Sequence, residues 1–193
     1  MRPAVFLDRD GTINEEVGYL HEVERLSLIP GAALAIKRLN DHGLLAVCIS
    51  NQSGVARGYH SEDAVLAINK RLVDLLGAEG ARLDGIYFCP HHPTEGEAPY
   101  RIDCGCRKPG TGMIEQAVSD LSVDLSRSFL IGDRVTDIET AHHAGVKGVL
   151  VLTGYGAQEY GHVHQGYTAV PDHVSRDIGA AVDWILRNQT PSS

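Results

Sequence analysis

Long apolar runs are absent from this sequence of 193 residues. The longest, residues 44–49, is far below the roughly 18 residues that a membrane-spanning helix needs, and no apolar region typical of a signal peptide precedes Asp8. Basic residues are few, because 17 Lys and Arg stand against 25 Asp and Glu, a formal charge of −8. That balance argues against broad binding to nucleic acid or anionic membranes. We therefore expect a cytoplasmic protein, monomeric and without nucleic-acid or membrane partners.

Cysteine is also scarce. Four cysteines are too few for a disulfide framework in a chain of this length, and three of them, Cys89, Cys104 and Cys106, lie near one another and beside histidines. With His91 they supply three thiolates and one imidazole, which complete a tetrahedral Zn²⁺ shell with no open position. His92 is the competing fourth ligand. The pattern predicts a structural zinc site in the loop 89–106.

Short apolar runs alternate with segments of helical periodicity. The runs expected to form buried strands are 4–7, 44–49, 85–88, 128–131 and 149–152. The segments expected to form helices are 31–42, 61–76, 113–121, 137–144 and 178–186. This alternation predicts an α/β fold, a doubly wound, Rossmann-like and mostly parallel sheet of about five strands with helices on both faces. No linker divides the chain, which indicates one domain over residues 1–193, and 154–173 shows neither period nor chemistry.

Carboxylates follow two of the predicted strands, at the edge where open α/β sheets bind ligands. Asp8 and Asp10 follow the first strand, and Asp133 and Asp137 follow the fourth. Carboxylates gathered at one edge repel one another unless a divalent cation lies among them. Mg²⁺ is the natural candidate because it takes hard oxygen ligands, waters and substrate phosphate. The predicted Mg²⁺ ligands are Asp8, Asp10 and Asp133.

The same edge carries groups that can bind a phosphate. Ser50 follows the second predicted strand with a hydroxyl, and Asn51 can offer donors to a small anion. Lys108 precedes Pro109, which disfavours helical backbone at Lys108 and keeps the chain extended there. A lone Ser or Lys is usually a solvated surface group. Their joint placement is what predicts a phosphate site.

In this order, these residues resemble the four motifs of the haloacid dehalogenase superfamily of phosphotransferases, over about residues 4–153. The resemblance implies that Asp8 is a nucleophile that forms an aspartyl-phosphate. It also implies that Asp10 protonates the leaving alkoxide and then activates water. Ser50 and Lys108 would then stabilise the transferred phosphoryl group.

The fourth motif, residues 132–137, completes the resemblance. It implies that Asp133 is a metal ligand and that Asp137 orients Lys108 or a metal-bound water. The chain between the motifs is too short for a large cap domain, which indicates an open site shaped by small loops.

Two further motifs narrow the resemblance. Residues 51–58, Asn-Gln-Ser-Gly-Val-Ala-Arg-Gly, and 104–109, Cys-Gly-Cys-Arg-Lys-Pro, are similar to those of zinc-loop members of the superfamily that act as heptose bisphosphate phosphatases. The likeness favours His91 as the fourth zinc ligand and implies a sugar phosphate substrate in nucleotide-activated heptose biosynthesis. The implied substrate-binding residues are Glu16, Val17, Gly18, Tyr19, Asn51, Gln52, Ser53, Arg107 and Arg134. Relatives often carry Lys at position 134, so the contact made by Arg134 is left open.

Other functions share parts of this pattern. Histidinol-phosphate phosphatases carry the same motifs and a zinc loop, although a shorter one than the twelve-residue spacer between His91 and Cys104. A phosphoacceptor receiver domain also combines carboxylates, a hydroxyl and a lysine around Mg²⁺. Receivers place the acceptor aspartate after the third strand and the lysine last, whereas Lys108 here precedes Asp133. A polynucleotide end phosphatase is disfavoured by the acidic net charge.

Overall fold

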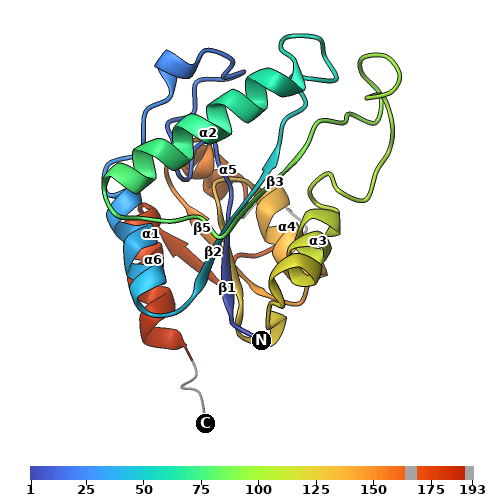
Figure 1. The fold of residues 1–193 in the computed structure, drawn as a ribbon. Helices are drawn as coiled ribbons and strands as arrows, with labels where there is room; N and C mark the ends of the chain where they lie inside the picture. The colour runs from blue at the N-terminus through green and yellow to red at the C-terminus, as the bar shows by residue number, and fades with distance from the viewer. Residues whose placement is uncertain (164–168, 190–193) are drawn as a thin grey trace.

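A single parallel sheet forms the centre of the molecule in the computed structural model, which describes residues 1–163 and 169–189 (Figure 1). The strand order is β3-β2-β1-β4-β5-β6, and every neighbouring pair is parallel. The strands are β1 (Ala4–Leu7), β2 (Leu45–Asn51), β3 (Gly85–Cys89), β4 (Phe129–Gly132), β5 (Lys147–Val151) and β6 (His173–Ser175). The predicted doubly wound α/β fold is confirmed, with six strands in place of about five. The sixth has only three residues, too few to show a period.

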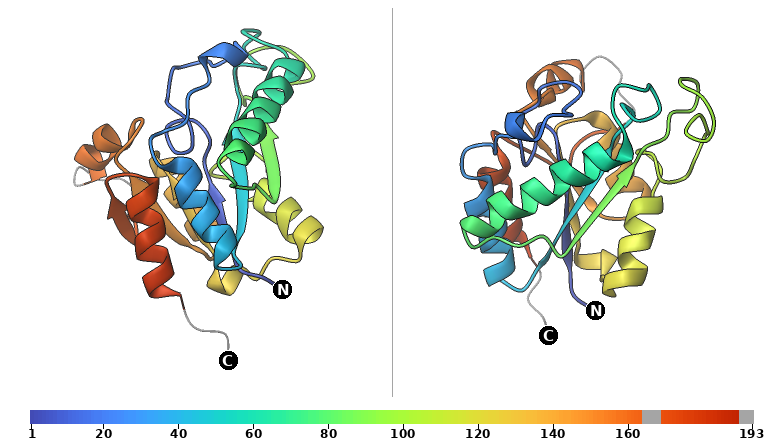
Figure 2. Two further views of the ribbon diagram at one scale, coloured as in Figure 1. Left: turned by 60° about the vertical axis from the view of Figure 1, so that its left-hand side comes forward. Right: turned by 45° about the horizontal axis from the view of Figure 1, so that its top comes forward.

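Helices cover both faces of the sheet (Figure 2). On one face lie α1 (Ala32–Asp41), α2 (Glu62–Ala78) and α6 (Ile178–Asn188), whose apolar side chains pack with Val5 and Leu7 of β1. On the other face, α3 (Gly112–Leu121) and α4 (Val135–His143) pack with Ala4 and Phe6. All four β1 side chains are buried because alternate residues enter different helical layers.

The remaining elements are short. Two 3₁₀ turns, η1 (Val23–Arg25) and η2 (Leu125–Arg127), and helix α5 (Gly156–Val163) complete the described chain. Helix α4 begins at Val135, two residues before the predicted start, so Asp137 lies in its first turn. The segment 154–173, to which no structure was assigned from its sequence, contains α5 and the first residue of β6, and its residues 164–168 lie outside the described part of the chain.

The strand order sets the position of the functional site. The chain leaves β1 toward β2 on one side and later returns to β4 on the other, so the topological switch point lies between β1 and β4. Ligands in open α/β sheets bind at such points, beyond the carboxyl ends of the strands. Loops after β1, β2 and β3 rise above this edge (Figure 1), and they carry most of the residues singled out from the sequence.

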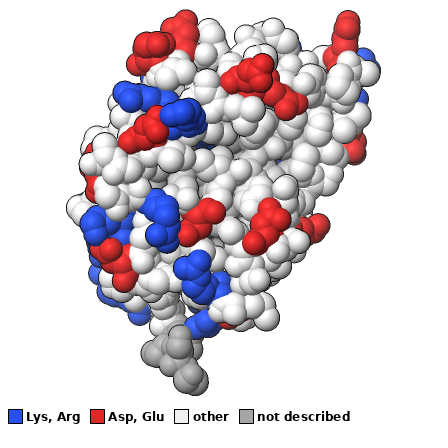
Figure 3. All heavy atoms as spheres, in the orientation of Figure 1, with Lys and Arg blue, Asp and Glu red and all other residues white. Residues whose placement is uncertain are grey.

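Neither the described helices nor the charges on the face drawn in Figure 3 indicate a membrane-spanning segment or a broad nucleic-acid surface. Among the described residues, no helix is both long enough and apolar enough to cross a bilayer. On the face drawn in Figure 3, acidic and basic side chains are interspersed, and no continuous basic surface covers that face.

Candidate active site

Lys108 and two aspartates form a buried cluster at the carboxyl edge of the sheet. The Nζ of Lys108 lies 2.5 Å from Oδ1 of Asp8 and 2.6 Å from Oδ1 of Asp137, and it donates to the carbonyl oxygen of Ile49 at 3.2 Å. Burial disfavours the charged form of Lys108, but the charges of Asp137 and Asp8 outweigh burial and raise its pKa. Lys108 is therefore an ammonium at neutral pH, held between the ends of β1 and the start of α4.

A third carboxylate, Asp133, follows β4 beside this pair. Oxygen atoms of Asp8, Asp133 and Asp137 all lie within 4.8 Å of one another. Burial raises the pKa of Asp133 to about 8, and the charges of Asp8 and Asp137 add to the effect. Burial also raises the pKa of Asp8 to about 7, although Lys108 acts in the opposite direction. When all three carboxylates are ionised, the single ammonium of Lys108 leaves two negative charges uncompensated, which is why protons are retained on Asp8 and Asp133.

This donor set fits a divalent cation. Oδ1 of Asp133 is buried and has no hydrogen-bond partner among the described residues, whereas its Oδ2 accepts from the backbone N–H of Tyr155 at 2.8 Å. Carboxylate oxygens are the ligands that Mg²⁺ prefers. Two glycines keep space around Asp133, because a Cβ on Gly11 or Gly154 would lie 2.3 or 2.2 Å from its Oδ2.

Asp10 is held by three neighbouring side chains. The Nη2 of Arg9 donates to its Oδ2 at 2.8 Å, Asn14 donates to its Oδ1 at 2.9 Å, and Gln52 donates to its Oδ2 at 2.9 Å. Burial raises the pKa of Asp10, but the charge of Arg9 and these hydrogen bonds outweigh burial and leave its pKa below the ordinary value. The Asp10 side chain is 18% exposed, and it faces the cavity described below. Asp10 is therefore ionised and fixed in orientation.

The end of β2 contributes Ser50, Asn51 and Gln52. Ser50 is buried, and its hydroxyl accepts a hydrogen bond from Gln52 at 3.3 Å. The sequence predicts Asn51 as a donor to an anion, but its Nδ2 donates to the carbonyl of Lys108 at 3.1 Å, and its Oδ1 accepts from the N–H of Lys108 at 3.0 Å. Both ends of the Asn51 amide therefore hold the backbone from which the lysine side chain extends.

A cavity of about 420 Å³ opens above these carboxylates. Asp8, Asp10, Lys108 and Asp137 line it, while Ser50 and Asp133 lie buried beneath. Of the predicted substrate-binding residues, those in the lining are Glu16, Gly18, Tyr19, Asn51, Gln52, Ser53, Arg107 and Arg134. Val17 is outside this lining, and it is 37% exposed.

The predicted zinc ligands come together in the loop after β3. The ligand atoms of Cys89, His91, Cys104 and Cys106 all lie within 4.8 Å of one another. Nδ1 of His91 is 3.2 Å from the Sγ of Cys104 and 3.4 Å from that of Cys106. His92 is turned away, because its Nδ1 accepts hydrogen bonds from backbone N–H groups of the loop. Three thiolates and one imidazole supply all four ligands of a tetrahedral ion and leave no position open, as in a structural metal site.

The predicted zinc-binding loop, residues 89–106 (the cysteine loop), leads directly into the rim of the cavity. Arg107, directly after Cys106, donates from Nη1 to the carbonyl of His91 at 3.2 Å. Arg57, in the loop after β2, forms an ion pair with Glu95 and lines the cavity. Arginines at the rim above a floor of carboxylates suit an anionic ligand. The contact of Arg57 with the cysteine loop was not expected from the sequence.

Tyr155 also lines the cavity, although no motif in the sequence singles it out. The guanidinium of Arg134 lies 3.8 Å above the Tyr155 ring, and its Nη1 is 3.9 Å from Oε1 of Glu159. A planar guanidinium can stack on the face of an aromatic ring, and this stacking fixes the orientation of Arg134. Tyr155 follows the fifth strand, so the rule that ligands bind beyond strand ends, applied to that strand as well, would have found it.

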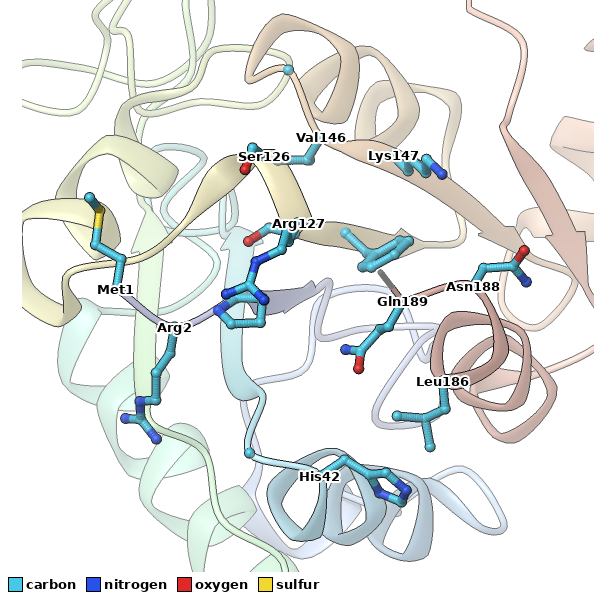
Figure 4. A pocket seen from close by; sticks show the side chains of 15 residues that line it. Met1, Arg2, His42, Ser126, Arg127, Val146, Lys147, Leu186, Asn188 and Gln189 are labelled. Carbon is cyan, nitrogen blue, oxygen red and sulfur yellow. The ribbon is translucent and has the colours of Figure 1, made fainter. Parts of the chain in front are cut away.

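A larger cavity, of about 530 Å³, lies at the opposite end of the sheet (Figure 4). Arg2, Arg127 and Lys147 are among its lining residues, and Arg127 is paired with Asp124 at 2.8 Å. Its described lining includes none of the residues predicted for the site. Because open α/β sheets bind ligands at the carboxyl ends of their strands, the smaller cavity is the candidate active site.

Known proteins are similar to this chain in sequence and in fold. The profile of the HAD-hydrolase-like family matches residues 105–181. The D-glycero-D-manno-heptose-1,7-bisphosphate 7-phosphatase of Thermosynechococcus vestitus is 49% identical over an alignment 194 positions long, gaps included, which covers 98% of this chain and 98% of that protein. The D-glycero-beta-D-manno-heptose-1,7-bisphosphate 7-phosphatase of Pasteurella multocida is 45% identical over 168 residues, 86% of this chain and 91% of the relative. The solved D,D-heptose 1,7-bisphosphate phosphatase of B. bronchiseptica, complexed with magnesium and phosphate, has a TM-score of 0.83 at 31% identity, covering 97% of this chain and 99% of that one.

The parallel sheet, the carboxylate and lysine cluster at its edge and these relatives define a class of enzyme, the phosphoric monoester hydrolases of the HAD type. The resemblance expected from the motifs is confirmed. Within that class, the chain belongs to the family of D-glycero-D-manno-heptose-1,7-bisphosphate 7-phosphatases.

Proposed function

We propose that this protein removes the 7-phosphate of D-glycero-D-manno-heptose 1,7-bisphosphate, in the synthesis of nucleotide-activated heptose. The observation that carries the proposal is the cavity itself. Its floor holds Lys108 at 2.5 Å from Asp8, and its rim holds Arg107 and Arg134. A bisphosphate brings two dianions, and an acidic protein must meet each of them with local positive charge. Lys108 serves the reacting phosphate, and the rim arginines serve the distant one.

Asp8 acts as the nucleophile. Its carboxylate oxygen attacks phosphorus and the bond from phosphorus to the sugar oxygen breaks, while Asp10 donates a proton to that leaving oxygen. In the second step Asp10 takes a proton from water, the water oxygen attacks phosphorus, and the bond to Asp8 breaks. A bound phosphate dianion raises the pKa of nearby Asp10 by repulsion, opposing the low value set by Arg9. Ser50 and Lys108 stabilise the transferred group.

Two metals belong to this proposal. Asp8 and Asp133 would hold a catalytic Mg²⁺ with their carboxylates and Asp10 with its backbone carbonyl, which leaves the Asp10 carboxylate for proton transfer; when bound, the ion neutralises the carboxylates and the phosphoryl oxygens. Cys89, His91, Cys104 and Cys106 would hold a structural Zn²⁺, because thiolates select the softer ion. Asp137 keeps Lys108 in place at 2.6 Å.

Residues 1–193 act as one catalytic domain with the zinc-binding loop at 89–106, in the cytoplasm and as a monomer. The lining residues predicted for substrate binding, among them Glu16, Tyr19, Arg107 and Arg134, contact the sugar and its distant phosphate.

Phosphate release from a panel of substrates tests the proposed function. The panel holds the heptose 1,7-bisphosphate, histidinol phosphate and a 3′-phosphorylated oligonucleotide, each with and without Mg²⁺. We expect the highest kcat/KM with the heptose bisphosphate, and loss of activity without Mg²⁺. A higher kcat/KM with histidinol phosphate or the oligonucleotide would overturn the substrate assignment.

A further inference from the structure

Arg9 is a buried cation between the two catalytic aspartates of the sequence. Its side chain is 0% exposed, although arginine is among the residues that are almost never fully buried unless paired. Arg9 is absent from the cavity lining, whereas its neighbours Asp8 and Asp10 are part of it. A buried guanidinium must find partners within the protein, and those partners show what Arg9 does.

One edge of the guanidinium, formed by Nε and Nη2, hydrogen-bonds to the Asp10 carboxylate. Nη2 donates to Oδ2 at 2.8 Å and to Oδ1 at 3.1 Å, and Nε donates to Oδ1 at 3.3 Å. Both carboxylate oxygens are therefore contacted by one planar group. Such a two-point contact fixes the carboxylate plane as well as its position. Asn14 and Gln52 each add a single further contact.

The other side of the guanidinium is anchored to a helix. Nη1 of Arg9 donates to Oδ1 of Asn69 at 3.1 Å, and Asn69 lies in α2 and is buried. The backbone carbonyl of Arg9 also accepts from the N–H groups of Ile13 at 2.9 Å and Asn14 at 3.1 Å. Arg9 thus connects the turn that carries Asp10 to the packed core of the protein.

We propose that Arg9 is a positioning residue that holds the Asp10 carboxylate in its working orientation, with Asn69 as its anchor. The inference rests on the proposed acid and base role of Asp10. Two cations at this edge of the sheet then have different partners. Lys108 contacts the nucleophile Asp8, and Arg9 contacts Asp10, the general acid and base. Arg9 itself touches no substrate, because it is fully buried outside the cavity.

The size of the effect follows from what Asp10 supplies. General acid and base catalysis contributes about 10²- to 10⁴-fold to a rate, and a misplacement of about 1 Å can cost about 10²-fold. Arg9→Lys keeps the charge but loses the planar fork, so we expect kcat to fall about 10-fold. Arg9→Met loses both, and kcat should fall about 100-fold. KM should change by less than about 3-fold in each case.

A double-mutant cycle separates positioning from general structural support. In the Asp10→Asn background the carboxylate is already gone, so Arg9→Met should lower the residual rate less than about 2-fold. Thermal unfolding is measured for all four proteins of the cycle. Arg82→Lys is the matched control, because Arg82 also forks onto an aspartate, Asp84, at an exposed place away from the cavity. It should leave kcat unchanged.

Asn69→Ser gives a second route to the same answer if Arg9→Met does not fold. It removes the anchor and leaves both charges in place, and it should lower kcat about 3-fold with KM unchanged. Unchanged kcat in both Arg9→Lys and Asn69→Ser would overturn the proposal. So would an equal loss from Arg9→Met with Asp10 present and with Asn at that position. Failure of the proposed function is recognised separately, because wild type would then release no phosphate from the heptose bisphosphate.

Discussion

The carboxylate cluster predicts how the stability of the magnesium-free protein depends on pH. Asp8 and Asp133 have an ordinary pKa of 3.8 and folded-state pKa values of about 7 and about 8. A carboxyl group with a raised pKa binds a proton in the folded chain and not in the unfolded chain. Its contribution to stability is complete below the ordinary value and is lost as pH rises through the folded value. The free energy of unfolding should therefore fall with rising pH across that window.

The magnitude follows from linkage. Each such group changes the free energy of unfolding by about 1.4 kcal/mol per pH unit, so Asp8 and Asp133 together give roughly 2–3 kcal/mol per unit between about pH 5 and about pH 6.5. Histidines His60, His92 and His173 act in the opposite direction, because burial lowers their pKa values. The difference between wild type and Asp133→Asn removes that background, and it should be about 1.4 kcal/mol per pH unit.

Urea unfolding at constant ionic strength measures these slopes, with Mg²⁺ removed by a resin and zinc retained. Asp41→Asn is the control, because Asp41 is an exposed partner of Lys37 and should leave the slope unchanged. Saturating Mg²⁺ should flatten the additional slope of wild type, because a bound divalent cation keeps the carboxylates ionised. Equal slopes for wild type and Asp133→Asn, or a wild-type slope that Mg²⁺ leaves unchanged, would refute this reasoning.

Three further outcomes follow from the site. Cys104→Ser should release zinc and lower the melting temperature, and unchanged zinc content by atomic absorption with unchanged melting would contradict the ligand assignment. Removal of Mg²⁺ by EDTA should abolish phosphate release and be reversed by Mg²⁺ alone; a requirement for added zinc in protein that has kept its structural zinc through the treatment would make zinc part of the catalytic site. Arg107→Ala should lower kcat/KM about 10- to 100-fold for the heptose bisphosphate and less for a monophosphate, and an equal loss on both would make Arg107 a general phosphate ligand.

The sequence was sufficient for the elements that follow a simple period or position rule. Buried strands read as continuous apolar runs because helices cover both faces, which is why β1 and β2 were expected close to where they lie. The meeting of Asp8, Asp133 and Lys108 followed from their positions at strand ends or before a helix. Strand β6 could not be found in this way, because its three residues carry no period and its pairing with β5 depends on the whole sheet.

Several side-chain roles depend on distant partners and were not visible in the sequence. Asn51 was expected to face an anion, and it binds the backbone of Lys108, 57 residues further along the chain. Arg9 would be expected at the surface from its residue type, but it is buried, and its guanidinium donates to Asn69, a residue of another element. A short motif indicates which residues belong to the site, whereas their hydrogen-bond partners depend on how distant loops and helices pack together.

Covalent catalysis requires that Asp8 is phosphorylated during turnover of the heptose bisphosphate. Acid quenching within one turnover, followed by borohydride reduction, converts an aspartyl-phosphate to homoserine, which peptide mass spectrometry locates. We expect homoserine at position 8 in wild type, none in Asp8→Asn, and loss of phosphate release in that variant with its fold intact. Rapid turnover with unmodified Asp8, or Asp8→Asn retaining more than a few per cent of wild-type activity, would contradict covalent catalysis by Asp8.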